Sequence, residues 1–470
     1  MTRIAIIGGG PAGYEAALVA AQLGAEVTLI EPQGLGGACV LYDCVPSKTF
    51  IATSETMTSF RGAPALGVRT PGGADGDVTV EAAVVNRRVK DLAEWQSEDV
   101  WQRLSGEGVR LLTGVGRFAA DQAGPTKRLE VLDPAGAVTQ TVDADVVLLA
   151  TGANPRVLPG AVPDGERILT WRQVYDLTEL PEHLIVIGSG VTGAEFASAY
   201  LEIGARVTLV SSRARVLPGE DTDAAEVIEE VFAEHGGEIV KRARAASVTR
   251  TEKGVLVTME DGRTVEGSHA LMTVGSVPNT DGLGLEHVGA TLGPGGFVQV
   301  DRVSRTTATG VYAAGDCTGV LMLASVAAMQ GRIAMWHALG EAVTPLRLKT
   351  VSATVFTHPE IATVGIQEKA ITAGEVPARM VTMPLASNAR AKMQGLSDGF
   401  VKLFCRPATG AITGGVVVAP SASELILPVT MAVQLGLTVS QLASTFSVYP
   451  SLSGSLTEAA RRLMVHDDLV

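Results

Sequence analysis

Two cysteines near the amino terminus are the side chains of this 470-residue chain most suited to chemistry. Cys39 and Cys44 are separated by four residues, and the run Pro46-Ser47-Lys48 follows them. We expect helical geometry to bring both thiols onto one face, where they could close a disulfide. Because the chain has only four cysteines, a structural disulfide framework is disfavoured and redox chemistry is favoured. The alternative is that both cysteines are small buried hydrophobic residues.

A glycine-rich turn precedes the cysteines and lies between two predicted strands. Residues 4–7 read as an apolar strand, residues 15–23 as a helix, and residues 25–30 as a second strand that ends at Glu31. Glycines let backbone amides approach a pyrophosphate at a helix N-terminus, and an acid after the second strand can accept hydrogen bonds from a ribose. A lone G-x-G-x-x-G pattern is weak evidence for a dinucleotide site. With the strand, the helix and the acid also in place, chance is a poor explanation for the pattern. The turn comprises Gly8, Gly10, Pro11, Ala12 and Gly13.

A second copy of this unit follows, with a strand over residues 184–187 and a helix over residues 194–201. Its second strand ends at Ser211 instead of an acid, and Arg213 and Arg215 come next. Without a carboxylate to repel it, a ribose 2′-phosphate could be bound beside these guanidinium groups. The alternative is that the arginines belong to an ordinary solvated turn. The first unit therefore predicts an FAD site, and the second predicts a nicotinamide-nucleotide site that favours NADPH.

Composition excludes several classes of function. The net charge of −13 argues against a nucleic-acid partner and against an anionic membrane surface. Hydrophobic residues make up 46% of the chain and charged residues 19%, as in a globular protein. No apolar run approaches the ~18 residues of a membrane span. Because the first strand begins by residue 4, we expect no targeting segment, and we expect a cytoplasmic protein without a metal site.

Several motifs occur in one order along nearly the whole chain. They are the paired nucleotide units, the Cys-x4-Cys with Pro-Ser-Lys, a strand that runs into Ala150-Thr151-Gly152, a run that begins at Gly275, and a Gly315-Asp316 turn. Together they resemble the flavoprotein disulfide reductases, the family of lipoamide dehydrogenase, glutathione reductase and mercuric reductase.

This resemblance implies the fold and the domain order. The expected class is α/β, with two Rossmann-like dinucleotide-binding domains and a C-terminal α+β dimerisation domain. We expect the FAD domain over 1–152, the NAD(P)H domain over 153–273, a return to the FAD domain over 274–345, and the dimerisation domain over 346–470. A homodimer is implied, in which the terminal segment reaches the partner's flavin.

The resemblance also implies the roles of particular residues. Cys44 would be the sulfur nearest the flavin, and Cys39 the one that meets an outside substrate. Lys48 would lie near the flavin N5, paired with Glu195, because a cation there stabilises reduced flavin. The residues implied for FAD are Gly8, Gly10, Pro11, Ala12, Gly13, Glu31, Gly37, Ala38, Lys48, Ala150, Thr151, Gly152, Gly315, Asp316 and Ala324. Those implied for NAD(P)H are Gly188, Gly190, Val191, Gly193, Glu195, Ser211, Arg213, Arg215 and Gly275.

The chain departs from the family near its carboxyl end. Disulfide reductases of this family carry a His-Pro there with a Glu five residues after the His, and this pair acts as acid and base for the thiols. Tyr449 and Gly454 stand at those two positions. Phenols ordinarily titrate near pH ~10 and imidazoles near ~6.5, so a tyrosine is not a ready proton acceptor at neutral pH.

Thiol–disulfide exchange needs a deprotonated attacking thiol, whereas reduced flavin can pass electrons directly to a quinone. The pattern therefore resembles a lipoamide-dehydrogenase-like branch of NAD(P)H quinone reductases that lacks the dyad, and we predict a quinone-type acceptor. Two alternatives stay open. One is a disulfide or metal-ion reductase that uses Cys39 and Cys44 with an unfamiliar proton donor, such as Tyr449. The other is a non-catalytic flavoprotein subunit or redox sensor.

Overall fold

Both glycine-rich turns lie at the carboxyl edges of parallel sheets in the computed structural model, which describes residues 1–69, 78–122 and 124–464. The chain divides into two compact units. Unit 1 comprises residues 1–49, 86–156 and 275–347, and unit 2 comprises residues 50–85, 157–274 and 348–470. Parts of the expected domains 1–152 and 346–470, namely 70–77, 123 and 465–470, lie outside the described residues.

The main sheet of unit 1 has five parallel strands in the order β18-β7-β1-β2-β3. Three of its strands are almost wholly apolar and buried, and a fourth buries its four central residues, as expected for a parallel sheet that is covered on both faces. The strands are β1 (Arg3–Ile7), β2 (Glu26–Glu31), β3 (Arg110–Thr113), β7 (Val146–Leu149) and β18 (Val311–Ala313).

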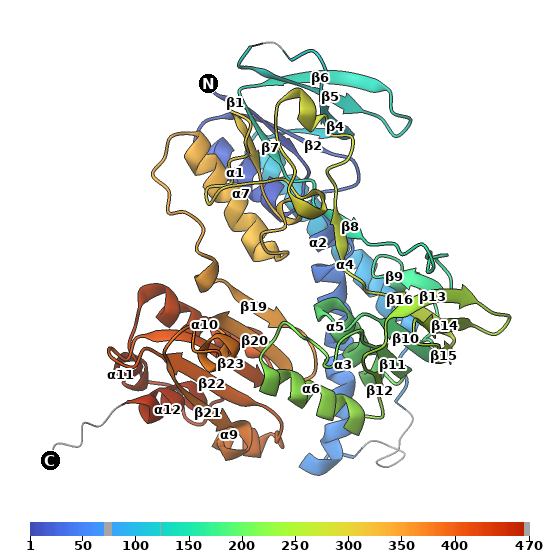
Figure 1. Cartoon of the computed structure of the whole chain (residues 1–470), viewed down its shortest axis with the longest axis vertical. Helices are drawn as coiled ribbons and strands as arrows, with labels where there is room; N and C mark the ends of the chain where they lie inside the picture. Colours follow the sequence, from blue (N-terminus) through green and yellow to red (C-terminus); the bar gives the residue numbers. More distant parts are fainter. Residues whose placement is uncertain (70–77, 123, 465–470) are drawn as a thin grey trace. The chain divides into compact units, whose positions relative to one another are not determined.

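Two helices of unit 1, α1 (Pro11–Gln22) and α7 (Ala324–Ala338), lie side by side (Figure 1). A Cβ atom on Gly331 would stand 2.2 Å from the carbonyl oxygen of Ala12, so the glycine permits their close approach. The rest of the unit contains α2 (Gly37–Leu41), most of α4 (Ala82–Gly106), an antiparallel sheet of β4 (Val115–Phe118), β5 (Lys127–Leu132) and β6 (Val138–Ala144), and the pair β8 (Ala153–Pro155) and β17 (Ser276–Pro278).

Unit 2 contains a second parallel sheet in the order β12-β11-β10-β16-β9. Its strands are β9 (Ile168–Thr170), β10 (His183–Ile187), β11 (Arg206–Val210), β12 (Glu238–Val240) and β16 (His269–Met272), and its helices are α5 (Val191–Glu202) and α6 (Thr222–Glu234). An antiparallel sheet adds β13 (Ala245–Arg250), β14 (Val255–Met259) and β15 (Thr264–Gly267). This arrangement is the second Rossmann-like fold that the sequence predicts.

The carboxyl-terminal part of unit 2 is an antiparallel sheet in the order β19-β20-β23-β22-β21, packed against helices. Its strands are β19 (Ser352–Val355), β20 (Glu360–Gly365), β21 (Arg379–Pro384), β22 (Phe400–Cys405) and β23 (Ile412–Ala419). Its helices are α8 (Glu368–Thr372), α9 (Ala389–Met393), α10 (Ala422–Leu435), α11 (Val439–Ala443) and α12 (Gly454–Leu463). Among the described residues, no helix is long and apolar enough to span a bilayer.

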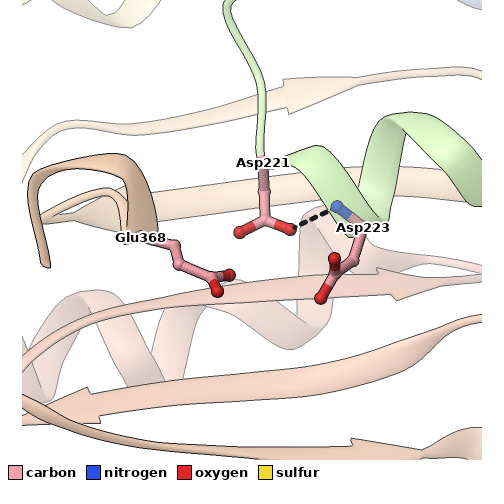
Figure 2. A group of neighbouring side chains, drawn as sticks. All are labelled: Asp221, Asp223 and Glu368. Carbon is pink, nitrogen blue, oxygen red and sulfur yellow. Dashed lines mark hydrogen bonds between the residues drawn. The ribbon is translucent and has the colours of Figure 1, made fainter. Parts of the chain in front are cut away.

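A buried lysine sits among three carboxylates in unit 2. Figure 2 shows Asp221, Asp223 and Glu368, whose ligand oxygens lie within 4.8 Å of one another. The Lys402 ammonium donates to Asp221 at 2.9 Å, to Asp223 at 2.8 Å and to Glu368. Burial alone would lower the pKa of Lys402, but these hydrogen bonds outweigh it and raise the pKa. The acidic cluster therefore already holds a cation that belongs to the chain.

Candidate active site

The first glycine-rich turn has the geometry of a dinucleotide cradle. Gly8 has a φ of +107°, and a Cβ there would lie 2.2 Å from the carbonyl oxygen of Ala150. A Cβ on Gly13 would lie 1.9 Å from the carbonyl oxygen of Gly8. By contrast, no described atom lies within 4 Å of the position for a Cβ on Gly10. Gly8 and Gly13 thus serve the fold, whereas Gly10 leaves space for a ligand at the start of α1.

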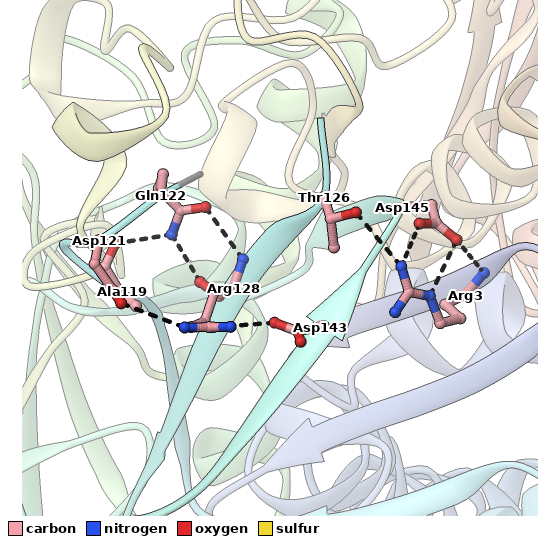
Figure 3. Close-up of polar contacts among 8 residues, drawn as sticks. All are labelled: Arg3, Ala119, Asp121, Gln122, Thr126, Arg128, Asp143 and Asp145. Atoms are coloured by element: carbon pink, nitrogen blue, oxygen red, sulfur yellow. Dashed lines mark hydrogen bonds and ion pairs between the residues drawn. The ribbon is translucent and has the colours of Figure 1, made fainter. Parts of the chain in front are cut away.

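Polar contacts at the other end of β1 hold the strand in register (Figure 3). The Arg3 amide donates to the Asp145 carboxylate at 2.9 Å, and the guanidinium donates to it at 2.6 Å. In the antiparallel sheet of the same unit, Arg128 of β5 donates to Asp143 of β6 at 3.2 Å. Asp145 immediately precedes β7, so its bonds align β1 with β7 and bring Gly8 against Ala150.

The acid at the end of β2 is tied to the same turn. Glu31 accepts hydrogen bonds from the amide of Gly9 at 2.7 Å and from the amide of Gln33 at 2.8 Å. It also lines a cavity of about 360 Å³, whose walls include Leu29, Leu41, Glu94, Trp101 and Leu111. A cavity with both apolar and acidic walls suits an adenosine group, which has an apolar base and a ribose that donates hydrogen bonds, so these residues fit the adenosine half of FAD.

Two further predicted motifs are held by hydrogen bonds within unit 1. The Thr151 hydroxyl donates to the carbonyl of Asn279 at 2.7 Å, and the Asn279 amide donates to the carbonyl of Gly152 at 3.0 Å. Gly315, with a φ of +79°, donates its amide to the buried Gln330 at 2.9 Å. Burial, followed by the nearby Asp43 carboxylate, raises the pKa of Asp316 to about 6.

The two predicted redox cysteines lie together but on two different helices. Cys39 is in α2, which ends at Leu41, and Cys44 is the first residue of α3 (Cys44–Gly62). The expectation of one helical segment for both is therefore wrong, because the chain leaves the helix at Tyr42 and restarts at Cys44. A hydrogen bond between the side chains lowers the pKa of Cys39 and raises that of Cys44. Cys39 is accordingly the better nucleophile of the pair.

Other charged groups tune these thiols. Besides burial, the negative charge of Asp43 raises the pKa of both cysteines, whereas the Lys48 ammonium lowers both. Tyr14 also lies near this site, since burial and then the charge of Cys39 raise the pKa of its phenol. Sequence reasoning gave no role to Asp43 or Tyr14. An acid directly before Cys44 was a signal for the first, but Tyr14 carried none.

The second glycine-rich turn repeats the geometry of the first. Gly188 has a φ of +113°, and its Cβ would lie 2.3 Å from the carbonyl oxygen of Thr273. A Cβ on Gly193 would lie 1.8 Å from the carbonyl oxygen of Gly188, whereas Gly190 has open space. Ser211 is fully buried, and its hydroxyl lies 2.7 Å from that of Ser189 in the turn.

The predicted residues beyond this turn fall into different surroundings. Arg213 is exposed, whereas Arg215 is half-buried and lines a cavity of about 550 Å³ together with several acids. Glu195 is buried in α5 and accepts a 2.9 Å hydrogen bond from the amide of Phe356. Lys48 belongs to unit 1 and Glu195 to unit 2, and their pairing stays a prediction.

Most of the remaining predicted cofactor-binding residues lie at the starts of helices. Pro11 and Ala12 open α1, Gly37 and Ala38 open α2, Val191 opens α5 and Ala324 opens α7. Gly275, predicted for NAD(P)H, is the first residue of the last segment of unit 1. Gly37 lies against the first turn, because its Cβ would stand 2.9 Å from the Cα of Gly10.

The segment in place of the family's acid–base pair is exposed and apolar. Phe446, Val448 and Tyr449 have relative exposures of 104%, 77% and 84%. Gly454 is the first residue of α12, and its amide donates to the Ser451 hydroxyl at 3.2 Å. The structure therefore holds no imidazole or carboxylate at the two positions.

A cysteine pair beside one dinucleotide fold, with a second such fold in the chain, defines an oxidoreductase that uses pyridine nucleotides. The family model for pyridine nucleotide-disulphide oxidoreductases matches residues 2–331, and the model for their dimerisation domain matches residues 351–460. The chain therefore belongs to this family, the flavoprotein disulfide reductases, whose cofactors are FAD and NAD(P)H. The predicted fold class is confirmed.

Two curated relatives and two solved structures illustrate this membership. A protein from Mycobacterium tuberculosis (strain ATCC 25618 / H37Rv), named NAD(P)H dehydrogenase (quinone), is 62% identical over 100% of this chain and 95% of its own. A dihydrolipoyl dehydrogenase from Chlorobaculum tepidum is 33% identical over 97% and 96%. The crystal structure of LpdA from Mycobacterium tuberculosis has a TM-score of 0.94 at 61% identity and covers 99% of this chain and 100% of that one. The HOCl-induced flavoprotein disulfide reductase RclA from Escherichia coli has a TM-score of 0.84 at 25% identity, with the same coverage.

Proposed function

We propose that this chain is an FAD-dependent NAD(P)H oxidoreductase that passes electrons from NAD(P)H to quinone-type acceptors. The observation that carries the proposal is the 62% identity, over the whole chain, to a protein named NAD(P)H dehydrogenase (quinone). The site is in keeping with this activity. It retains both nucleotide turns, and the exposed segment around Tyr449 offers apolar surface instead of an acid–base pair.

The proposal assigns binding roles to unit 1. Gly10 and the start of α1 would receive the pyrophosphate of FAD, Glu31 the ribose, and Asp316 a further hydroxyl group of the cofactor. When bound, the flavin accepts two electrons from the nicotinamide and releases them singly or in pairs. Lys48 would place positive charge near the ring system, where it favours an anionic form. These roles, like the others predicted from the sequence, belong to the proposal.

The proposal also covers organisation and location. We assign FAD binding to residues 1–152 and 274–345, NAD(P)H binding to 153–273, and dimerisation to 346–470. Two copies would form a homodimer, for which the dimerisation-domain match over residues 351–460 is the support. A cytoplasmic location is kept, because a redox-active thiol pair with few other cysteines suits a reducing compartment.

A second candidate function is the reduction of a disulfide or a metal ion. The observation that favours it is the hydrogen-bonded pair of Cys39 and Cys44, in which the Cys44 thiol stabilises the Cys39 thiolate. Such a pair is suited to attack on an external disulfide. It lacks a histidine to receive the proton, since Tyr449 stands at that position.

Steady-state turnover separates the two functions. Purified protein with NADPH is assayed with a benzoquinone, with lipoamide and with oxidised glutathione, in the parent and in the Cys39→Ser and Cys44→Ser variants. We expect both variants to retain most quinone reduction, and the parent to reduce either disulfide poorly. Brisk disulfide reduction by the parent, together with loss of quinone reduction in both variants, would establish the second candidate instead.

A further inference from the structure

Two chain segments at the carboxyl ends of β11 and β12 run side by side. The strands are parallel neighbours, with Val210 opposite Val240. Beyond them, the Ser211 amide donates to the carbonyl of Val240 at 2.9 Å. The Arg242 amide then donates to the carbonyl of Arg213 at 2.9 Å. Residues far apart in the sequence are thus joined where a ligand crevice opens in such a sheet.

Arg242 has an unusual backbone that is supported by its neighbours. Its φ is +52°, which lies in the left-handed region that residues other than glycine rarely adopt. The guanidinium of Arg263 donates to the carbonyl of Arg242 at 2.9 Å, and Arg263 is itself held by Asp261 at 2.7 Å. The Arg242 side chain is exposed. The fold therefore fixes the backbone of Arg242 and leaves its charge at the surface.

Two neighbouring cations, unlike Arg242, lie close to carboxylates. Lys241 is paired with Glu229 at 2.5 Å. Arg215 lines a cavity whose walls include four carboxylates, those of Glu220, Asp221, Asp223 and Glu368. Among the described residues, no carboxylate forms an ion pair with Arg213 or Arg242. These two guanidinium groups keep their charge available to an anion.

The position at the end of β11 decides which nucleotide can bind. In dinucleotide folds an acid here accepts the ribose 2′-hydroxyl group, and an arginine nearby accommodates a 2′-phosphate. Ser211 occupies the position, and its hydroxyl lies near Ser189 at 2.7 Å and accepts from the amide of Arg213 at 3.1 Å. No negative charge therefore opposes a phosphate at this position.

We propose that Arg242 binds the 2′-phosphate of NADPH together with Arg213, as a determinant of nucleotide choice that lies just beyond the end of the neighbouring strand β12. The inference rests on the proposed function only in that unit 2 takes a pyridine nucleotide. A guanidinium presents several donors in a fixed fork, so two of them on adjacent strand ends can hold a phosphate from two sides.

The test compares two nucleotide fragments that differ only in the 2′-phosphate. Calorimetry measures binding of 2′,5′-ADP and of 5′-AMP to the flavin-loaded protein and to the Arg242→Gly variant. Glycine suits the left-handed backbone, so this change removes the guanidinium without straining the turn. We expect 2′,5′-ADP to bind about tenfold or more weakly in the variant, as for a lost charge-assisted contact, with 5′-AMP unchanged. Raising the salt concentration should weaken 2′,5′-ADP binding more in the parent than in the variant.

Two other variants sharpen the result. Lys253→Gly removes an exposed cation from the loop between β13 and β14, and it should leave both affinities unchanged. Arg215→Ala should weaken 2′,5′-ADP binding less than Arg242→Gly does. The proposal is overturned if Arg242→Gly binds 2′,5′-ADP as tightly as the parent does, or if its affinity for 5′-AMP falls as much as its affinity for 2′,5′-ADP. It is also overturned if Arg215→Ala weakens 2′,5′-ADP binding more than Arg242→Gly does.

Failure of this inference can be told apart from failure of the proposed function. If the parent reduces quinones while Arg242→Gly leaves 2′,5′-ADP binding intact, only the role of Arg242 is wrong. If no quinone is reduced with either NADH or NADPH, but Arg242→Gly loses 2′,5′-ADP selectively, only the quinone activity is wrong.

Discussion

The main-chain amide of Gly9 donates a 2.7 Å hydrogen bond to the carboxylate of Glu31. This bond joins the glycine-rich turn to the end of the next strand. One oxygen of Glu31 is thus committed to Gly9, and the other accepts from the amide of Gln33 at 2.8 Å. The carboxylate is held in one place, so a ribose would meet an acceptor that has already been oriented.

The glycines of this turn should respond differently to alanine. A methyl group on Gly10 meets open space in the chain itself, whereas one on Gly13 would lie 1.9 Å from the carbonyl oxygen of Gly8. We expect Gly10→Ala to fold with normal stability in the flavin-free state but to retain FAD poorly, because its methyl group fills the space for the pyrophosphate. Thermal unfolding and flavin absorbance after gel filtration measure the two properties. Gly13→Ala should instead be destabilised without flavin, and equal stability of the two variants would contradict this division of roles.

Replacing Asp43 should make the cysteine pair more reactive. The carboxylate contributes to a raised pKa in both Cys39 and Cys44, so Asp43→Asn should lower both values. In the dithiol-reduced protein, alkylation of Cys39 by iodoacetamide at neutral pH should then be faster, with the pH profile moved to lower pH. Asp91→Asn, which removes an exposed acid from α4, serves as the control. An identical profile for Asp43→Asn and the parent would show that this charge does not reach the thiols.

The half-buried Asp316 should make the free energy of unfolding depend on pH. Its pKa is raised by burial from an ordinary value of 3.8 to about 6 in the folded chain. The folded state therefore binds the proton more tightly than the unfolded state does. The stability that this proton gives to the fold is fully present below pH ~4 and is lost as the pH rises through ~6. For flavin-free protein we expect the free energy of unfolding to decrease by about 2–3 kcal/mol across this range, and Asp316→Asn should abolish this decrease. Denaturant unfolding at a series of pH values measures this dependence. Parallel curves of unfolding free energy against pH for the parent and the variant would refute the role of Asp316.

The charge of Lys402 should be essential to unit 2. Its side chain is 1% exposed, and its ammonium forms ion pairs with Asp221 and two neighbouring carboxylates. Lys402→Met should lower the free energy of unfolding by about 3–5 kcal/mol, because it leaves carboxylates uncompensated in a buried place. Lys369→Met, at an exposed lysine of α8, should have little effect. The double variant Lys402→Met/Asp221→Asn should recover part of the lost free energy of unfolding, as measured by chemical denaturation. No recovery would argue against charge as the cause.

Local patterns in the sequence were sufficient for the elements that bind nucleotides. A strand, a turn with glycines at fixed places and a helix are specified by nearby residues, and the structure has β1 (Arg3–Ile7) and α1 (Pro11–Gln22) around the predicted turn. The same applies to β10 (His183–Ile187) and α5 (Val191–Glu202). The two cysteines were placed correctly near each other, but the break between their helices was missed, because helical spacing alone does not reveal where a five-residue helix ends.

Residues that act through tertiary pairing could not be predicted in this way. Arg242 meets Arg213 only because β12 pairs with β11, and nothing in the local sequence gives that register. Tyr14 of α1 lies near enough to Cys39 of α2 for the charge of Cys39 to raise the pKa of its phenol, and no local pattern shows this proximity. Lys402 was a partial exception, since a lysine within the otherwise apolar strand β22 (Phe400–Cys405) signals a buried cation, although its partners lie in distant segments.

Restoring the family's acid–base pair should give this chain disulfide reductase activity. The double variant Tyr449→His/Gly454→Glu should acquire NADH-dependent reduction of lipoamide, or increase it, by about 10²–10⁴-fold if the new imidazole reaches the thiols, which is the usual contribution of a positioned acid or base. The pH profile should show a new group near the ordinary histidine value of ~6.5. Quinone reduction should change little, since it draws protons from solvent.

Two comparisons make this result interpretable. Tyr449→Phe keeps the ring and removes the hydroxyl group, so an unchanged quinone rate would show that the phenol of Tyr449 is not a proton donor for that reaction. Adding Cys39→Ser to the double variant should abolish the acquired lipoamide activity, because the thiol that exchanges with the substrate is then absent. If the double variant folds, binds FAD and still fails with lipoamide, the lost dyad is not what separates this chain from the disulfide reductases. The difference would then lie closer to the thiols, where Asp43 opposes the thiolate that such exchange requires.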